Sequence, residues 1–194
     1  MNFLAHIYLS GDDCLIQIGN FMADGIRGRD YEFYPEHVQR GIILHRAIDT
    51  FTDAHPIFRQ GTKRLHAKYH HYAGVIMDVY YDHFLAANWS RYSSLTLKEY
   101  SENFYKCLED HDELLTDKTR NMLPIMKREN WLLTYATPDG IEKILKQMDY
   151  RTGHKSGMGN AKFELLQFYD EYNNEFSEFF EDIREHSQQF LATC

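Results

Sequence analysis

Residues 41–53 read GIILHRAIDTFTD, and this stretch decides the fold. It has the composition of a helix, yet polar side chains stand among apolar ones. At about 100° per residue, His45, Asp49 and Asp53 fall within about 80° of one another on the helix surface. Ile42 and other apolar residues flank this polar stripe on both edges. We therefore expect the stripe to face the interior, where its carboxylates need an arginine, another buried polar group or a metal ion as partner.

A second pair of inward-facing carboxylates is expected in the most apolar helix candidate, residues 73–89. Asp78 and Asp82 are four residues apart and therefore share one face with apolar neighbours. His83 points elsewhere on a straight helix, so it ranks below the aspartates as a candidate ligand.

Polar residues are also spaced four apart near the N-terminus, as Asn2 and His6 and then as Asn20 and Asp24. Each has a simple structural explanation when taken alone. His6 fits a hydrogen-bonded core histidine, and Asp24 fits a carboxylate at a helix end. A buried polar network without any metal therefore remains one interpretation of all these residues.

The other interpretation is a metal site, because two aspartates and a histidine from separate helices converge inside the protein. Carboxylate and imidazole ligands suit Mn²⁺, Fe²⁺ or Mg²⁺ better than soft metals. Such an ion would neutralise the carboxylates, polarise a phosphoryl oxygen and lower the pKa of a bound water. Arg46 borders the stripe and is expected either to pair with Asp49 or Asp53 or to bind a phosphate oxygen.

The composition fits one packed domain over residues 1–194, with 43% hydrophobic and 15% aromatic residues. No apolar run reaches the length of a membrane span, and the N-terminal segment lacks the basic region of a signal peptide. The cysteines are widely spaced and odd in number, which is neither a disulfide framework nor a zinc motif. We therefore expect a cytoplasmic protein whose cysteines are reduced: Cys14, Cys107 and Cys194.

Helix signals dominate, because glycine is scarce and no run alternates as a strand would. The pattern predicts an all-α fold, a single-domain bundle of about seven to nine helices. The aromatic residues near the C-terminus, such as Phe176 and Phe180, could pack in the core or form a dimer face. The expected helices cover residues 12–23, 35–53, 57–69, 73–89, 97–111, 117–130, 138–149 and 160–186.

Four short motifs stand in roughly the first 90 residues. They are NFLAH at 2–6, GNFMAD at 19–24 followed by Arg27, the stretch at 41–53, and DVYYDHFL at 78–85. In order and spacing they resemble the bacterial acyl carrier protein phosphodiesterases. That family is regarded as an all-helical, Mn²⁺-dependent relative of the His-Asp metal-dependent phosphohydrolases, so a His-Asp-phosphohydrolase-like fold is implied.

The resemblance implies a hydrolase that removes 4′-phosphopantetheine from the serine of holo-acyl carrier protein. Carried onto this chain, its candidate metal residues are His6, Asp24, His45, Asp49, Asp78 and Asp82. Of these, Asp24, Asp49 and Asp78 are also candidate catalytic residues, together with Arg46, which the helix pattern places beside the stripe. The forward His-Asp dipeptide of ordinary His-Asp enzymes is missing, and the reverse pair stands at positions 82–83 instead.

The net charge of −8 is uneven, since residues 38–71 hold six basic and two acidic residues. Nonspecific nucleic-acid binding is disfavoured at this overall charge. An acidic carrier protein would instead meet a docking surface of basic residues: Arg27, Arg29, Arg59, Lys63, Arg64 and Lys68. Two other functions remain open at this stage. One is a metal phosphohydrolase of a small nucleotide or phosphate ester, and the other is a non-enzymatic helical binding module.

Overall fold

The structure is a computed structural model that describes residues 2–193. Every regular element in that range is helical, which confirms the expected all-α class. None of these helices has the length and apolar character needed to cross a membrane. The α-helices are α1 (Phe3–Leu9), α2 (Cys14–Met22), α3 (Glu36–Ala54), α4 (Pro56–Tyr69), α5 (Ala73–Ala87), α6 (Leu97–Asp110), α7 (Asp117–Glu129), α8 (Trp131–Thr134), α9 (Pro138–Arg151), α10 (Lys162–Gln167) and α11 (Tyr169–Thr193).

The helices within residues 2–193 outnumber the expected seven to nine for two reasons. The short helices α1 and α8 lack a long periodic pattern, so they were not expected. The helix expected over 160–186 divides at Phe168, whose backbone leaves the helical region with φ −118° and ψ 32°. The second part, α11, then continues to Thr193.

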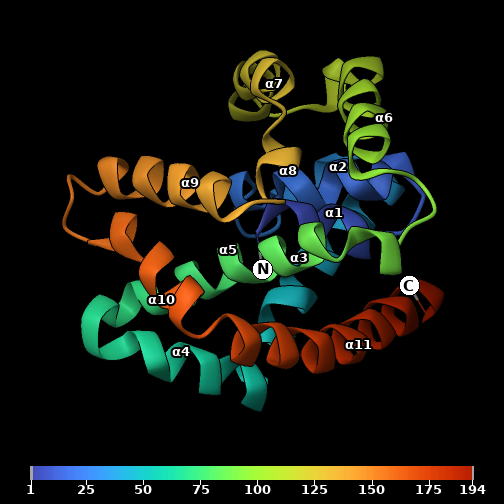
Figure 1. The fold of residues 1–194 in the computed structure, drawn as a ribbon. Coiled ribbons are helices and arrows are strands. Elements are labelled where there is room, and N and C mark those ends of the chain that lie inside the picture. The colour runs from blue at the N-terminus through green and yellow to red at the C-terminus, as the bar shows by residue number, and fades with distance from the viewer. Residues whose placement is uncertain (1, 194) are drawn as a thin grey trace.

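Helix α5 runs through the centre of the core. Its residues Tyr80, Tyr81 and Phe84 are fully buried, as expected for a helix that is apolar on most faces. Figure 1 shows α6 and α7 at one end of the molecule, α4 and α11 at the other, and α1, α2, α3 and α5 between them. The aromatic residues Phe176 and Phe180 of α11 are also fully buried, so they pack in the core.

Helix α1 is held in place by a side chain from α5. Seven residues are too few for a stable isolated helix, so its first backbone N–H groups need partners. Asp82 accepts hydrogen bonds from the backbone N–H of Leu4 at 2.7 Å and of Ala5 at 3.1 Å. The Asn2 side chain accepts a third from Phe3. These bonds fix α1, and with it the position of His6.

Helices α2 and α3 approach each other through two glycines. A Cβ atom on Gly19 would lie 2.1 Å from the carbonyl oxygen of Val38, and one on Gly41 would lie 2.1 Å from that of Ile16. No side chain fits at either position, so the two backbones are in direct contact. This approach places the polar residues that follow on the two helices next to each other.

Gly41→Ala should therefore destabilise the protein strongly, since the added methyl group meets backbone that cannot move independently. We expect a loss of about 3 kcal/mol or more in the free energy of unfolding, at the upper end of overpacking effects. Urea denaturation measures it. Gly74→Ala in α5 is the matched control, because its Cβ would meet nothing within 4 Å and alanine favours the helix by up to about 1 kcal/mol. Equal stabilities of the two variants would contradict the contact.

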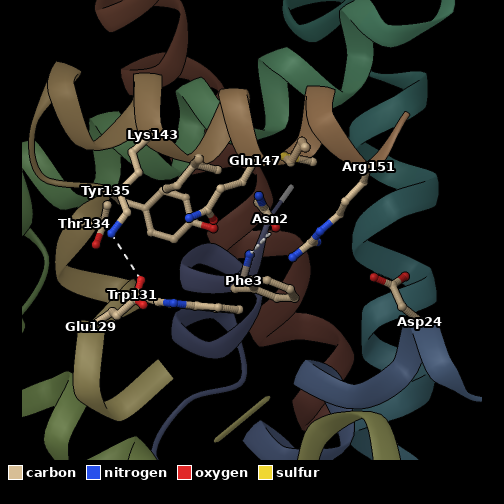
Figure 2. A pocket seen from close by; sticks show the side chains of 12 residues that line it. Asn2, Phe3, Asp24, Glu129, Trp131, Thr134, Tyr135, Lys143, Gln147 and Arg151 are labelled. Carbon is tan, nitrogen blue, oxygen red and sulfur yellow. Dashed lines mark hydrogen bonds and ion pairs between the residues drawn. The ribbon is translucent and has the colours of Figure 1, made fainter. Parts of the chain in front are cut away.

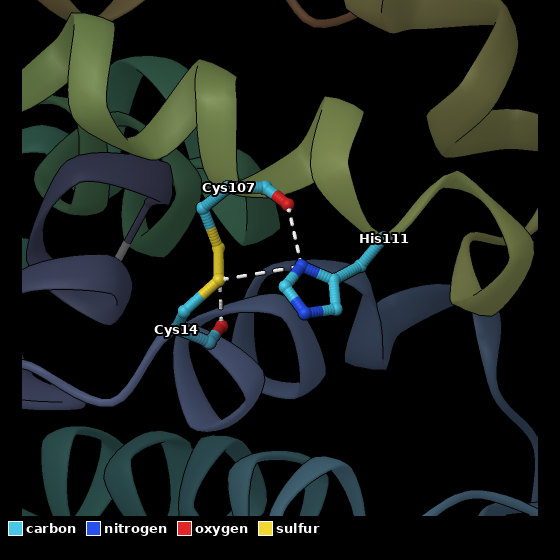
Figure 3. A group of neighbouring side chains, drawn as sticks. All are labelled: Cys14, Cys107 and His111. Carbon is cyan, nitrogen blue, oxygen red and sulfur yellow. Dashed lines mark hydrogen bonds between the residues drawn. A yellow bond between two sulfur atoms is a disulfide. The ribbon is translucent and has the colours of Figure 1, made fainter.

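The expected reduced state of the cysteines is wrong for two of them. Cys14 of α2 and Cys107 of α6 form a disulfide across 93 residues (Figure 3), whereas Cys194 lies outside the described residues. The sequence could not indicate the pairing, because spacing along the chain says nothing about which helix ends meet. His111 lies beside the bond, with its Nδ1 3.0 Å from the carbonyl oxygen of Cys107. The disulfide links α6 to α2, and Asp24 follows the end of α2 in the chain.

Candidate functional site

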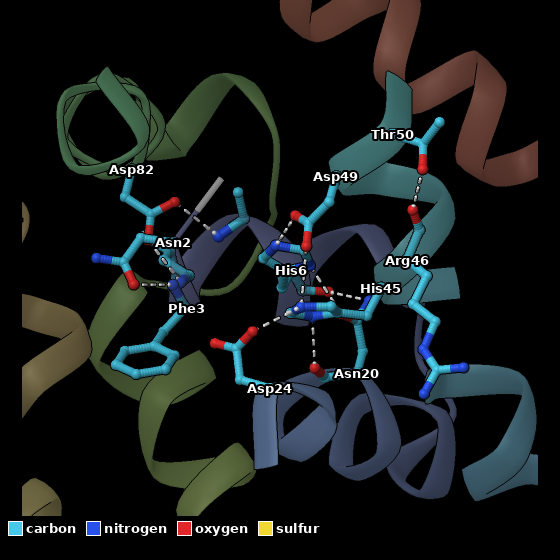
Figure 4. Close-up of polar contacts among 12 residues, drawn as sticks. Asn2, Phe3, His6, Asn20, Asp24, His45, Arg46, Asp49, Thr50 and Asp82 are labelled. Carbon is cyan, nitrogen blue, oxygen red and sulfur yellow. Dashed lines mark hydrogen bonds and ion pairs between the residues drawn. The ribbon is translucent and has the colours of Figure 1, made fainter. Parts of the chain in front are cut away.

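Two histidines from different helices stack at the centre of a polar cluster (Figure 4). The rings of His6 in α1 and His45 in α3 have centroids 4.1 Å apart and planes 20° apart. Both side chains are buried. The side-chain oxygen of Asn20 in α2 lies 2.8 Å from Nδ1 of His6 and 3.1 Å from Nδ1 of His45. One amide from α2 therefore holds both imidazoles.

The orientation of that amide fixes the histidine tautomers. The Asn20 side-chain nitrogen donates to the carbonyl oxygen of His6 at 3.0 Å and to the hydroxyl of Ser10 at 2.9 Å. Its oxygen must then face the two rings, where it can only accept. Both Nδ1 atoms carry a hydrogen, so each neutral ring has its lone pair on Nε2. An Nδ1–H bound to an oxygen and a free Nε2 are typical of a histidine that ligates a metal.

Two carboxylates face the Nε2 atoms. Asp49 bridges the two Nε2 atoms, with one oxygen 3.2 Å from Nε2 of His6 and the other 3.1 Å from Nε2 of His45. Asp24 lies 3.2 Å from Nε2 of His45. The contact of His6 with Asp49 is close but poorly aligned, so its buried Nε2 has no hydrogen bond among residues 2–193. This nitrogen lacks such a bond and faces the cluster, so it could serve as a ligand to a cation.

The two stacked imidazoles hold protons very differently. Burial lowers the pKa of His6 to about 4. Burial also opposes the charged form of His45, but hydrogen bonds to Asp24 and Asp49 outweigh it and raise its pKa to about 9. Burial opposes the charged form of Asp49 as well, but its contacts with His45 and His6 outweigh this effect and hold the pKa of that carboxyl well below its usual range. At neutral pH the metal-free cluster therefore holds one imidazolium against ionised carboxylates.

This cluster lines a cavity of about 320 Å³, which Thr52, Asp53 and Asp78 also line. The Thr52 hydroxyl is buried and has no hydrogen bond to any residue in the described part of the chain. Burial raises the pKa of Asp78. Nitrogen and oxygen atoms of His6, His45 and Asp49 lie within 4.8 Å of one another. Imidazole and carboxylate donors at this spacing, around a polar cavity, fit a divalent cation of the hard or borderline class.

Asp82 lies outside this cavity, in contrast to the expectation that it ligates a metal. Both of its oxygens accept hydrogen bonds from the first turn of α1, and the residue is fully buried. Asp82 therefore caps the N-terminus of α1. A sequence pattern cannot distinguish an inward-facing aspartate of this kind from a metal ligand. His83 also points elsewhere, since its ring contacts the carbonyl oxygen of Tyr135 at 2.7 Å and the hydroxyl of Tyr169 at 3.0 Å.

Arg46 does not make the expected contact with Asp49 or Asp53. Its guanidinium donates to the carbonyl oxygen of Ile26 at 3.3 Å and lies over the ring of Tyr31. Figure 4 shows it extending away from the two histidines. Its position at the edge of the polar stripe lets this side chain turn outward, so it is absent from the cavity lining.

A second cavity of about 190 Å³ adjoins the first (Figure 2). Asn2, Phe3, Asp24 and Met148 line both, so the two form neighbouring parts of one depression. The other lining residues come from the end of α7, from α8 with Tyr135 just after it, and from α9. Sequence reasoning missed all of them because no chemical motif marks them. They are Glu129, Trp131, Thr134, Tyr135, Lys143, Ile144, Gln147 and Arg151.

The expected docking residues divide into two groups. Arg64 forms a two-pronged ion pair with Glu175 of α11, and Lys68 forms one with Glu164 of α10 at 2.8 Å. Arg29 pairs with Glu32. These three are engaged within the chain. The remaining members are exposed and form no ion pair within the described residues: Arg27, Lys63 and Arg59, whose Nε donates to the carbonyl oxygen of Asp53 at 2.7 Å.

The opposite pKa shifts of the two histidines predict a stability maximum for the metal-free protein near pH 6.5. Above it, the folded protein keeps a proton on His45 that an unfolded histidine has released, so stability is lost as pH rises toward 9. Below it, the unfolded chain binds a proton that buried His6 refuses until about pH 4, so stability is lost as pH falls. On each side of the maximum, along the acid limb and the alkaline limb of the profile, the free energy of unfolding falls by at most about 3 kcal/mol.

Urea denaturation in the presence of a chelator, at a series of pH values, tests this profile. His45→Gln should flatten the alkaline limb and leave the acid limb, whereas His6→Gln should do the reverse. If the free energy of unfolding of a variant followed the same dependence on pH as that of the parent protein, the assignment of that limb to the substituted histidine would be contradicted.

Comparison with known proteins places the chain among relatives of similar length. A family model described as acyl carrier protein phosphodiesterase matches residues 1–183. The protein of that name from Photorhabdus laumondii is 30% identical over 197 residues, covering 100% of this chain and 98% of that protein. Those from Yersinia pestis and Escherichia coli are 26% and 29% identical, each covering 97% of this chain and 98% of the relative. No solved structure matches it. The resemblance drawn from four motifs is confirmed and extends over nearly the whole chain.

Proposed function

We infer that this chain, which belongs to the acyl carrier protein phosphodiesterase family, hydrolyses the phosphodiester that joins 4′-phosphopantetheine to the serine of holo-acyl carrier protein. The products are the apo-carrier and 4′-phosphopantetheine. The observation that carries this proposal is the near full-length likeness to proteins of that name. The buried imidazole and carboxylate cluster supports it, because it offers the donor set that metal-assisted phosphodiester hydrolysis requires.

The proposed cofactor is a divalent metal ion, with Mn²⁺ ahead of Mg²⁺ and Fe²⁺. The residues that would hold it are His6 and His45 through Nε2, and Asp49 and Asp24 through carboxylate oxygens. Such an ion, when bound, neutralises charge on the phosphodiester and lowers the pKa of a coordinated water. His45 must give up its proton for the ion to bind, so loading is favoured as pH rises toward 9.

The chain's own residues supply the remaining steps. Asn20 fixes both rings with Nε2 facing the cavity. The attacking water forms a new bond to phosphorus and releases one proton to the solvent, while the bond from phosphorus to the serine oxygen breaks. The serine oxygen then needs a proton, and Asp78 is the proposed donor because it lines the cavity and burial raises its pKa. Asp24 lines both cavities and stands at their boundary.

The cytoplasmic location expected from the sequence belongs to this proposal as well. Glutathione and thioredoxin keep most cytoplasmic thiols reduced. The bond between Cys14 and Cys107 would then have to form under those conditions.

Purified protein should convert holo-carrier protein to the apo form in the presence of Mn²⁺, and a chelator should abolish the conversion. Intact-mass spectrometry detects the loss of the arm from the carrier. Asp49→Asn should lower the rate by about a hundredfold or more, because Asp49 contacts both histidines.

Asp182→Asn is the matched control for that variant, since Asp182 also contacts a histidine but lies on the surface of α11. It should retain the parent rate. Hydrolysis that persists in chelator would remove the metal from the proposal. Activity on free nucleotides without activity on holo-carrier protein would favour the small-ester phosphohydrolase instead.

A docking surface for the acidic carrier is the second part of the proposal. Arg59 and Lys63 line a shallow surface that shares Asp53 with the cavity of the histidine cluster. Arg27 follows Asp24, which lines the same cavity, by three residues in the chain. Their positive charge would steer a negatively charged carrier toward the cavity. Arg64 and Lys68 contribute less, because acidic residues of the chain already pair with them.

Lys63→Glu should raise the KM for holo-carrier protein several-fold at low salt and leave kcat unchanged. The effect should shrink at high ionic strength, where charges on the two surfaces are screened. Lys98→Glu on α6, another exposed lysine outside both cavities, is the control. Steady-state kinetics at two salt concentrations make the measurement. An unchanged KM for Lys63→Glu at low salt would rule out this surface.

A further inference from the structure

We propose that the second cavity, between α1, α8 and α9, is the subsite that binds the pantetheine arm, with Arg151 holding its phosphate. This inference rests on the proposed function, because it assigns part of the same substrate. It concerns residues that no motif marked. The site would accept a chain of amides with an apolar middle and one anionic end.

The position of the cavity is the first argument. It shares Asn2, Phe3, Asp24 and Met148 with the cavity of the histidine cluster. A substrate whose phosphodiester lies at the cluster must place the rest of its arm in a neighbouring space. Of these shared residues, Asp24 also contacts His45 directly, so the two spaces meet beside the cluster.

The lining is the second argument, because it combines apolar walls with amide groups. Phe3, Trp131 and Ile144 supply the walls, and the side chains of Asn2 and Gln147 supply amides. Gln147 and the indole N–H of Trp131 have no hydrogen-bond partner among residues 2–193, so they can donate to a ligand. Pantetheine has two amides separated by short links and a branched dimethyl group, which matches walls of this kind with a few placed donors.

Charge is the third argument. Figure 2 shows Arg151 extending from α9 across the cavity toward Asn2 and Phe3, on the side where Asp24 lies. Arg151 makes no ion pair within the described residues, whereas Lys143 at the opposite side is held by Glu129 at 3.1 Å. The second cavity therefore offers one guanidinium without an ion pair, next to the cavity of the histidine cluster. A guanidinium binds phosphate oxygens through paired N–H groups, which is the role that Arg46 cannot fill from its outward position.

Binding of free 4′-phosphopantetheine to the metal-free protein tests the subsite. The chain has two tryptophans, and Trp89 is buried and bonded to the carbonyl oxygen of Leu95. Ligand in the cavity should quench only Trp131. We expect a saturable fluorescence change that disappears in Trp131→Phe, while calorimetry still detects binding to that variant.

Arg151→Ala should weaken 4′-phosphopantetheine binding about tenfold to a hundredfold, as loss of a charge-assisted contact would. It should leave the binding of pantetheine, which lacks the phosphate, unchanged. Gln147→Ala should weaken both ligands alike. Lys146→Ala is the control on the same helix, since Lys146 pairs with Glu142 and does not line the cavity.

Kinetics separate the arm from the metal cluster. Gln147→Ala should raise the KM for holo-carrier protein while leaving hydrolysis of bis(4-nitrophenyl) phosphate, a diester without the arm, at the parent rate. A proportional loss on both substrates would mean that this variant damages the cluster, and would overturn the assignment.

The remaining outcomes separate this inference from the proposed function. Holo-carrier hydrolysis that survives Arg151→Ala and Gln147→Ala with unchanged KM would overturn the subsite and leave the proposed function standing. Quenching of Trp131 by 4′-phosphopantetheine, without any hydrolysis of holo-carrier protein, would support the subsite and overturn the proposed function.

Discussion

The direct contact between the backbones of α2 and α3 is the constraint on which the rest of the site depends. Gly19 and Gly41 leave no room for a side chain between the helices. Because of that approach, Asn20 on α2 reaches His45 on α3 and also His6 on α1. A wider spacing, such as side chains normally impose between helices, would separate the amide from at least one ring. The polar cluster is thus a product of this close backbone packing.

The periodicity of the sequence was enough to predict part of this cluster. His45 and Asp49 share one helical face with apolar flanks, and the structure brings them together with His6 and Asp24. Periodicity could not reveal what each inward carboxylate contacts. Asp82 faces inward as expected, yet its partners are backbone N–H groups of α1, a helix 77 and 78 residues away in sequence.

The features that sequence reasoning missed all depend on long-range contacts. The disulfide joins two helix ends that only the tertiary fold brings together. The apolar half of the depression comes from α8 and α9, where the residues look like ordinary helix surface in sequence. Trp131 of α8 and Arg151 of α9 acquire their proposed function only because the fold places both beside Asn2 and Phe3 in one cavity. Helix boundaries were easier to predict, since caps such as Thr96 with Glu99 are local signals.

The charge balance of the cluster links its stability to its chemistry. At neutral pH His6 is uncharged, so a single imidazolium on His45 stands against Asp24 and Asp49. The proton on His45 is held to about pH 9 because the two carboxylates require a cation beside them. A divalent ion that displaces this proton satisfies the same requirement with more charge and leaves both rings neutral. The features that stabilise the metal-free fold near neutral pH are therefore those that would select a cation for catalysis.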